Sequence, residues 1–284
     1  MPFSFKTILV PVDFSINTEV AINKALEVSD KEGATLHLMH VLSDKRPRLV
    51  LQNNNKSHDS FVKTAEPSVD QMMTEWKNTI EETNPHITVC CWLQRHTSVQ
   101  RSIEKKAKRL KADLLVVGKK SNHNWFPFLN TVVPHNLAKT TGCAVLTVKP
   151  GSLHTKIKTL VVPVTEDIPK HKMQTIAALC KTTRLKVHLV SFMNEHNVPV
   201  QFSSSALLKL YQWLKETLHC QVEYTVLHHD NKARAVLLYA EKVNADLLLV
   251  NPVSETRIGW MNKHISDVLS PDSKVQVLTV RHTF

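Results

Sequence analysis

The sequence is poor in glycine, and this scarcity excludes two kinds of nucleotide-binding loop. Among 284 residues only five are glycine, namely Gly33, Gly118, Gly142, Gly151 and Gly259. No two of them lie within three residues of each other. Neither the dinucleotide-binding fingerprint G-x-G-x-x-G nor the P-loop G-x-x-x-x-G-K-S/T is therefore present.

Long hydrophobic runs are also absent. No apolar run approaches the roughly 18 residues of a membrane span. The first residues, MPFSFK, lead directly into a strand-like segment and lack the layout of a signal peptide. With 42% hydrophobic and 21% charged residues, the composition is that of a globular chain. We expect a cytoplasmic protein with no membrane partner.

Cysteine is too irregular to suggest a disulfide framework. The five cysteines are an odd number, contain no CxxC pair, and lie mostly inside or beside apolar segments; they are Cys90, Cys91, Cys143, Cys180 and Cys220. We expect buried free thiols, as in a reducing cytoplasm. A disulfide or redox role is the alternative.

The excess of positive charge is not concentrated in a tail. Thirty-six basic against 25 acidic residues give a net charge of +11, spread almost evenly over the chain. One predicted helix, Arg101–Lys111, is strongly basic, but aromatic residues make up only 6% and no nucleic-acid-binding motif is present. We expect a solvated face and no nucleic-acid partner; a weak electrostatic contact is the alternative.

The chain contains the same series of segments twice. KTILVPV at 6–12 returns as KTLVVPV at 158–164, and ADLLVV at 112–117 returns as ADLLLV at 245–250. The segments TLHLM at 35–39 and VLTVK at 145–149 return in the same order. The offset falls from 152 to 132, so the second copy is the shorter one. This pattern indicates a duplication.

Each copy alternates predicted strands with predicted helices. Short runs rich in Val, Ile and Leu predict strands buried on both faces, in the first copy at 7–12, 35–41, 87–93, 113–117 and 144–148. Such alternation predicts parallel sheets with right-handed crossovers. We therefore predict an α/β fold of two tandem, doubly wound, five-stranded, Rossmann-like domains, at 1–150 and 155–284.

Two helices of the first copy have clear sequence signals. Ser15 is a candidate N-cap for a helix from Ile16 to about Glu32, with Gly33 as its stop. From Val99 to Leu110 apolar residues recur at helical spacing, while the lysines and arginines take the other faces. Residues 42–67 exceed the usual length of a connection, and we expect a mobile loop there rather than a lid.

Three segments resemble signatures of the universal stress protein family: TILVPVDFS at 7–15, ADLLVVG at 112–118 and GCAVLTV at 142–148. The resemblance covers both copies, closely in the first and with divergence in the second. It implies the Rossmann-like fold predicted above and a role in the stress response, and such tandem proteins are familiar in bacteria.

Members of this family that bind ATP carry G-x2-G-x9-G-S/T after the fourth strand, where main-chain N–H groups hold the phosphates. In the first copy Gly118 matches the first glycine, but Ser121 and the pair Thr131-Val132 do not match the rest. In the second copy none of the positions matches, since they fall on Asn251, Ser254 and His264-Ile265. The resemblance therefore implies a degenerate nucleotide site.

Asp13 resembles the acidic residue that contacts the nucleoside in the binding members, whereas the second copy has Thr165 there. An open α/β sheet binds ligands at the carboxyl ends of its strands, so we expect any site beside Asp13, Val41, Gly118 and Ser121. Residues 119–125, with two lysines, a histidine and a tryptophan, could still bind another ligand. A plain connection is the simpler interpretation.

Catalytic and metal sites have weaker signals. Ser15 is the best candidate nucleophile, but no G-x-S-x-G turn surrounds it. His37 and His40 face opposite sides of a strand, and His37 recurs as His188, which indicates a structural position. His228-His229 with Asp230 is a poor chelate. We predict no catalytic residues and no metal.

In this family the fifth strand commonly pairs across a symmetry axis. The resemblance here implies intramolecular pairing of 144–148 with 275–280, which gives a pseudo-two-fold monomer or a further homodimer. We predict a non-enzymatic stress-response or signalling module with no required cofactor. An AMP or ATP sensor acting through the first copy and a slow ATPase are the two alternatives.

Overall fold

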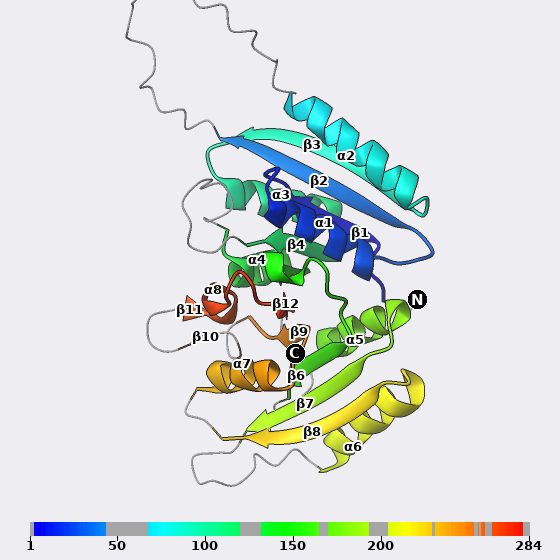
Figure 1. Ribbon diagram of the computed structural model, residues 1–284, viewed down its shortest axis with the longest axis vertical. Helices are drawn as coiled ribbons and strands as arrows, with labels where there is room; N and C mark the ends of the chain where they lie inside the picture. The colour runs from blue at the N-terminus through cyan, green and yellow to red at the C-terminus, as the bar shows by residue number, and fades with distance from the viewer. Residues whose placement is uncertain are drawn as a thin grey trace, which may run out of the picture.

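The strands of both halves join in a single sheet. The computed structural model describes residues 3–43, 68–119, 132–164, 170–192, 204–228, 231–252, 255, 257–258 and 263–280. Within these ranges ten strands form one sheet in the order β3-β2-β1-β4-β5-β12-β9-β6-β7-β8. Figure 1 shows this sheet running from β3 near the top to β8 near the bottom. The predicted Rossmann-like α/β fold is confirmed, with five strands from each half.

The first half alternates strands and helices as its sequence predicts. Its elements are β1 (Thr7–Pro11), α1 (Ile16–Val28), β2 (Ala34–Ser43), α2 (Val69–Thr83), β3 (Ile87–His96), α3 (Val99–Leu110), β4 (Leu114–Gly118), α4 (Pro134–Thr141) and β5 (Ala144–Val148). All neighbouring strands within this half are parallel. The proposed loop at 42–67 lies almost wholly outside the described residues, which resume at Ser68.

The second half repeats the same strand order. After the 3-10 turn η1 (Pro150–Ser152) come β6 (Thr159–Pro163), α5 (Lys170–Thr182), β7 (Lys186–Phe192), α6 (Ser204–Gln212), the π-helical turn η2 (Trp213–Thr217), β8 (Gln221–Leu227), α7 (Lys232–Lys242), β9 (Leu247–Val250), α8 (Ile265–Val268) and β12 (Gln276–Thr279). A short hairpin of β10 (Arg257–Ile258) and β11 (Lys263–His264) is separate from the sheet. The domain limits 1–150 and 155–284 remain a prediction.

The two halves meet where β5 pairs with β12. This pair is antiparallel, with Val277 opposite Thr147, Leu278 opposite Leu146 and Thr279 opposite Val145. The pairing expected between 144–148 and 275–280 is therefore present within one chain. It covers two apolar edges that would otherwise be free to pair with other molecules.

One face of the sheet carries a core that both halves share. Buried residues of α1, α2, α5 and α6 form a single apolar cluster, which includes Val20, Ile80, Ile176 and Leu210. On the opposite face each half has its own cluster, under α3 and α4 in the first half and under α7 and α8 in the second. The halves are thus joined by side-chain burial as well as by strand pairing.

The duplicated Ala-Asp segments make the same contact in both halves. Asp113 Oδ2 accepts hydrogen bonds from the main-chain N–H groups of Lys6 and Thr7, at 3.1 and 2.9 Å. Asp246 Oδ2 accepts from Lys158 and Thr159 at 3.0 and 2.9 Å. Each carboxylate therefore fixes the start of its half's first strand.

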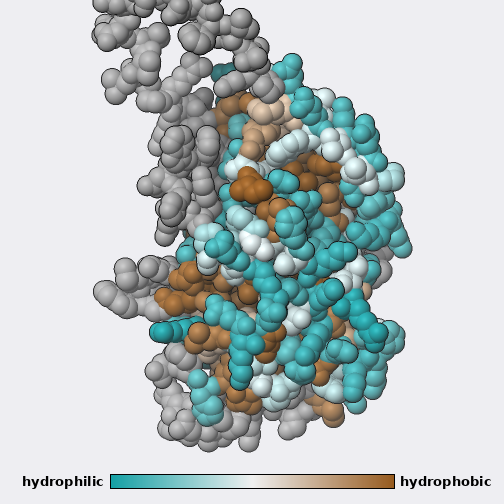
Figure 2. Space-filling view, in the orientation of Figure 1, coloured by the Kyte–Doolittle hydropathy of each residue, from teal (hydrophilic) through white to brown (hydrophobic). Residues whose placement is uncertain are grey.

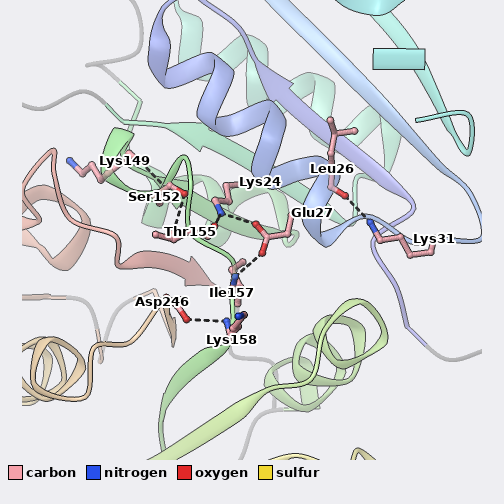
Figure 3. Close-up of polar contacts among 10 residues, drawn as sticks. All are labelled: Lys24, Leu26, Glu27, Lys31, Lys149, Ser152, Thr155, Ile157, Lys158 and Asp246. Carbon is pink, nitrogen blue, oxygen red and sulfur yellow. Dashed lines mark hydrogen bonds and ion pairs between the residues drawn. The ribbon is translucent and has the colours of Figure 1, made fainter. Parts of the chain in front are cut away.

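A partly buried ion pair holds the connection between the halves against α1 (Figure 3). Lys24 Nζ donates to Glu27 at 2.7 Å and also to the carbonyl oxygen of Thr155. The other oxygen of Glu27 accepts from Ile157 N at 2.7 Å. Lys24 is almost fully buried, and these contacts tie α1 to residues 155–157.

Three expectations about local structure were wrong. Helix α1 ends at Val28 rather than near Glu32, and Gly33, with φ of 134°, belongs to the turn into β2. Edge strand β3 is not buried on both faces, since Trp92 is 37% exposed. Lys106 of the basic helix is buried instead of solvated, with Nζ 2.8 Å from the centre of the Trp92 ring.

The face of the molecule shown in Figure 2 is mostly hydrophilic, with separate hydrophobic patches. Among the described residues, the seven large exposed apolar ones are spread over six elements, since only Trp92 and Leu93 share one, β3; the others are Ile16, Leu208, Tyr224, Leu238 and Val268. No helix in the described ranges is long and apolar enough to cross a membrane.

Gln276 of β12 supplies a test of the seam, which is the antiparallel pair of β5 and β12. Its side chain is fully buried, and neither amide atom has a partner among the described residues. We expect Gln276→Met to raise the free energy of unfolding by about 1 kcal/mol, because an unpaired buried amide is costly. Urea unfolding measures this, with Gln276→Ala as the control that leaves a cavity. A destabilised methionine variant would contradict the assignment.

Candidate functional site

Three of the predicted site residues lie at one edge of the sheet. Strand β1 lies between β2 and β4, and the three strands are parallel, so their carboxyl ends come together. Asp13 follows β1, Val41 lies near the end of β2, and Gly118 ends β4. The strand order reverses between β1 and β4, which is where open α/β sheets bind ligands. Ser121 lies outside the described residues.

The carboxylate of Asp13 organises the turn from β1 into α1. Its Oδ1 accepts from Ser15 N at 3.1 Å, from Ser15 Oγ at 2.6 Å and from Thr18 Oγ1 at 2.6 Å. Ser15 occupies the predicted N-cap position, but its side chain makes no capping hydrogen bond; its hydroxyl donates to Asp13 and accepts from Asn17 Nδ2 at 3.3 Å. The other oxygen of Asp13 has no partner among the described residues and can accept from an external donor.

The turn is held in an uncommon backbone conformation. Phe14 has φ of 58°, in the left-handed region of backbone conformation that residues other than glycine and asparagine rarely adopt. Its ring packs against the rings of His40 and Trp76, with 5.1 and 5.3 Å between the ring centres. His40 Nδ1 lies 2.8 Å from Val12 O. These contacts fix the position of the neighbouring Asp13.

Gly118 has a structural reason to be glycine. A Cβ atom at this position would lie 2.2 Å from the carbonyl oxygen of Asn17 and 2.6 Å from its carbonyl carbon. The first turn of α1 therefore packs directly on the end of β4. Because this contact alone requires glycine, the glycine does not by itself indicate a phosphate site.

Two other positions of the expected site face the core. Val41 is 1% exposed and belongs to the cluster under α3 and α4. Val132, which stands where the binding pattern needs a hydroxyl, is also 1% exposed and belongs to the same cluster. Neither side chain is directed to a ligand at the strand ends.

The cation that follows Gly118 is already paired. Lys119 Nζ forms an ion pair with Asp267, which belongs to α8 of the second half. Burial raises the pKa of Asp267, but the hydrogen bond and charge of Lys119 outweigh it, and the net shift is downward. The second half thus supplies the carboxylate that neutralises the charge at this edge.

Next to this ion pair, two imidazole rings stack across the seam. The rings of His135, on α4, and His264 lie 3.5 Å apart with an angle of 22° between their planes. Burial, and after it the charge of His264, lower the pKa of His135 from 6.5 to about 4. Lys149 is buried nearby, and burial followed by the charge of Lys119 lowers its pKa to about 8.

In the second half a buried carboxylate occupies the corresponding strand end. Asn251, which aligns with Gly118, donates its main-chain N–H to Glu255 Oε2 at 2.8 Å and its side-chain amide to Oε1 at 3.2 Å. Lys172 Nζ donates to Glu255 Oε2 at 2.7 Å and to Pro163 O at 2.8 Å. Lys172 and Glu255 are each 1% exposed. Glu255 therefore takes the N–H group and the cation that an anionic ligand would need.

Several other predicted positions cannot be placed. The residues that lie outside the described part of the chain are Ser254, Thr165, His229 with Asp230, and most of 119–125.

His37 and His188 occupy equivalent registers, opposite Leu9 and Val161. Each forms a side-chain hydrogen bond of 3.0 Å, His37 with Trp92 and His188 with Tyr239. Across the described ranges, no group of three or more His, Cys, Asp or Glu side chains could hold a metal.

A groove of about 820 Å³ lies away from these strand ends. It is lined by the later turns of α1, the end of α2, residues 153–156 and the end of α5. Because α1 begins beside Asp13 and runs toward the opposite edge of the sheet, this groove does not include the expected site.

The sequence contained signals for two residues that we did not single out. Lys172 interrupts an otherwise buried stripe of α5 that continues through Thr175, Ile176 and Leu179. A lysine on such a stripe requires a buried acidic partner. Glu255 lies four residues after Asn251, close enough to bond its main chain. Asp267 has no comparable signal, because its partner Lys119 is 148 residues away.

Comparisons with known proteins agree with this fold. The model of the universal stress protein family matches residues 4–149. The crystal structure of a universal stress protein from Archaeoglobus fulgidus DSM 4304 is 13% identical, with a TM-score of 0.61 over 99% of this chain and 100% of that one. A putative universal stress protein from Pseudomonas aeruginosa UCBPP-PA14 is 12% identical, with a TM-score of 0.53 over 98% and 94%.

The cytoplasmic domain of a prokaryotic cation chloride cotransporter also has this fold, at 10% identity and a TM-score of 0.53 over 98% of this chain and 95% of that domain. No curated protein matches the sequence. At these identities the structural likeness concerns the fold alone.

The stacked histidines predict a stability loss in mild acid. The unfolded chain takes up a proton at His135 near pH 6.5, but the folded chain does so only near pH 4. Stability from this group is therefore present above pH 6.5 and is lost as the pH falls toward 4. Because His135 is only half-buried, we expect a slope below about 1.4 kcal/mol per pH unit. Urea unfolding of wild type and His135→Phe should differ in slope in this window; equal slopes would contradict the assignment.

Proposed function

The chain belongs to the universal stress protein family, and we propose that it is a non-enzymatic stress-response module whose two nucleotide sites do not hold ATP. The observation that carries this proposal is shared by both halves. Near the end of the fourth strand of each half, a carboxylate of the protein already pairs with a lysine, Asp267 with Lys119 and Glu255 with Lys172.

In the first half a bound triphosphate would lack its usual partners. Lys119 would have to leave Asp267, which would remain as a negative charge beside the phosphates. Val132 faces the core and carries no hydroxyl. The main chain at Gly118 is covered by Asn17. Each of these features opposes the binding of a highly charged ligand.

In the second half the obstacle is a buried ion pair. An incoming phosphate would have to displace Glu255 from Asn251 and Lys172, two groups that it satisfies through three hydrogen bonds. The displaced carboxylate would then need a new partner or access to water. We therefore propose that this half has a structural role, in which its strand β12 pairs with β5 and covers that apolar edge of the first half.

A sensor of AMP through the first half is the second candidate function, and one observation favours it. Asp13 has one carboxylate oxygen without a partner among the described residues, at the strand ends where a nucleoside would bind. AMP carries a single phosphate and so depends least on the missing phosphate contacts.

We propose a cytoplasmic location.

The seam uses both β5 and β12, so any further homodimer must form through other surfaces, such as the outer strands β3 and β8 of the described sheet.

Thermal unfolding with nucleotides tests these proposals. We expect no rise in melting temperature with about 5 mM ATP or ADP, because the phosphate contacts are missing. A nucleotide that did bind, at about 100 times its Kd, would add about 2.7 kcal/mol to the free energy of unfolding. A rise of several degrees with ATP would contradict the proposal. A rise with AMP alone that Asp13→Ala abolishes, and the exposed control Asp70→Ala retains, would identify the sensor. Phosphate release from ATP above the buffer rate would contradict the non-enzymatic role.

The buried pair of the second half is tested by a double-mutant cycle. Glu255→Gln leaves the buried Lys172 ammonium without a counter-charge, and we expect it to lower the free energy of unfolding by about 3 kcal/mol. Lys172→Met should cost a similar amount. The double variant keeps an acceptor for Asn251 N–H and has no buried charge, so its loss should be smaller than the sum. Additive losses in urea unfolding would show that the two groups are independent.

A further inference from the structure

Two cysteines of the second half lie in contact although they are distant in sequence. Cys180 lies near the end of α5, and Cys220 immediately precedes β8. Their Sγ atoms are 3.2 Å apart. A disulfide bond is about 2.05 Å long, so the two atoms need to approach by only about 1 Å.

Both side chains are held in place by their surroundings. Cys220 is 4% exposed, and its main-chain N–H donates to Leu214 O at 2.9 Å. Cys180 is half-buried and packs on the same apolar core. Because the backbone on each side belongs to a packed element or its cap, the thiols keep their contact without the ordering of a loop.

The two thiols share a hydrogen bond, which makes them chemically unequal. Either sulfur can donate it, and when Cys180 is the donor the bond lowers the pKa of Cys220 in spite of its burial. The same bond, followed by burial, raises the pKa of Cys180. Cys220 therefore loses its proton first, and a thiolate is the form of cysteine that reacts with oxidants.

We propose that Cys180 and Cys220 form a reversible dithiol–disulfide site that a small peroxide oxidises. A small oxidant is required because Cys220 is almost completely buried. This inference is independent of the nucleotide sites, which lie at other residues of the chain.

The oxidation proceeds in two balanced steps. The Cys220 thiolate attacks one oxygen of hydrogen peroxide, the O–O bond breaks, and a sulfenic acid forms; the other oxygen leaves as hydroxide and takes up the proton that Cys220 released to become water. Cys180 then loses its proton and attacks the Cys220 sulfur, the S–O bond breaks, and water leaves. Overall two thiols lose two electrons and two protons, and hydrogen peroxide is reduced to two molecules of water. A thiol reductant reverses the reaction through disulfide exchange.

The remaining cysteines act as internal controls, because none has a second thiol in contact among the described residues. Cys90 and Cys91 are neighbours on β3 and point to opposite faces of the sheet. Cys143 is buried, and its sulfur contacts Thr141 Oγ1 at 3.0 Å. The expectation of buried free thiols is accurate for Cys143 and Cys220 but wrong for Cys91, which is exposed.

The disulfide would tie α5 to the outer strand β8. It closes a loop between residues 40 apart in sequence, which restricts the unfolded chain. We expect the oxidised protein to melt at least about 3 °C above the reduced protein.

The test is oxidation of the full-length protein with a small excess of hydrogen peroxide. Intact mass should fall by about 2 Da, the mass of two hydrogen atoms. Peptide mapping without reduction should join the peptides that contain Cys180 and Cys220, and dithiothreitol should reverse the change. A variant with Cys90, Cys91 and Cys143 all changed to serine should behave as wild type does.

Cys180→Ser and Cys220→Ser provide the matched negative controls. Each should lose the fall of about 2 Da and the rise in melting temperature, and circular dichroism establishes that each is folded. The proposal is overturned if wild-type protein gains oxygen atoms without losing hydrogen, if the linked peptides contain other cysteines, or if the bond joins two chains. It is also overturned if Cys180 and Cys220 of the wild-type protein stay reduced while Cys91 alone is oxidised.

Discussion

The antiparallel pairing of β5 with β12 is the interaction on which the rest of this structure depends. It converts two five-stranded units into one sheet, and it aligns α1 and α5 over a common core. Main-chain hydrogen bonds supply the pairing, and they tolerate many side chains. The second half can therefore diverge in sequence at its strand ends and still remain joined to the first, provided that its last strand stays apolar.

The divergence has not left the strand ends without charge. Where the binding members of the family use glycine and a bound phosphate, this chain places its own carboxylates, Asp267 against Lys119 and Glu255 against Lys172. The two cases differ in environment, because the Glu255 side chain is 1% exposed whereas the Asp267 side chain is 35% exposed. A buried charge without a partner is costly, so in the second half each member of the pair requires the other.

Much of the fold could be predicted from the sequence, but less of the site. Repeated segments such as KTILVPV and KTLVVPV predict two copies of the same series of strands and helices, because each strand is short, apolar and followed by a helical stretch; the order of the strands in the sheet comes from the structure. The end of α1 could not be predicted, since Gly33 is needed by the turn into β2 rather than by the helix. Lys106 and Asp267 depend on partners in distant elements, Trp92 and Lys119, and no local pattern records those contacts. Gly118 shows the same limit, because its close neighbour Asn17 lies a hundred residues earlier.

The reversal of direction at the seam also has a geometric consequence. All strands of the first half run one way and all strands of the second half run the other, so Asp13 and Gly118 open on one rim of the sheet, whereas Asn251 and Glu255 open on the opposite rim. Two molecules captured at these rims would sit back to back, with the whole length of the strands between them. The second half nevertheless reaches the first half's rim, where Asp267 of α8 pairs with Lys119 and the carbonyl oxygen of Pro271 accepts a hydrogen bond from Gly151 N at 2.9 Å.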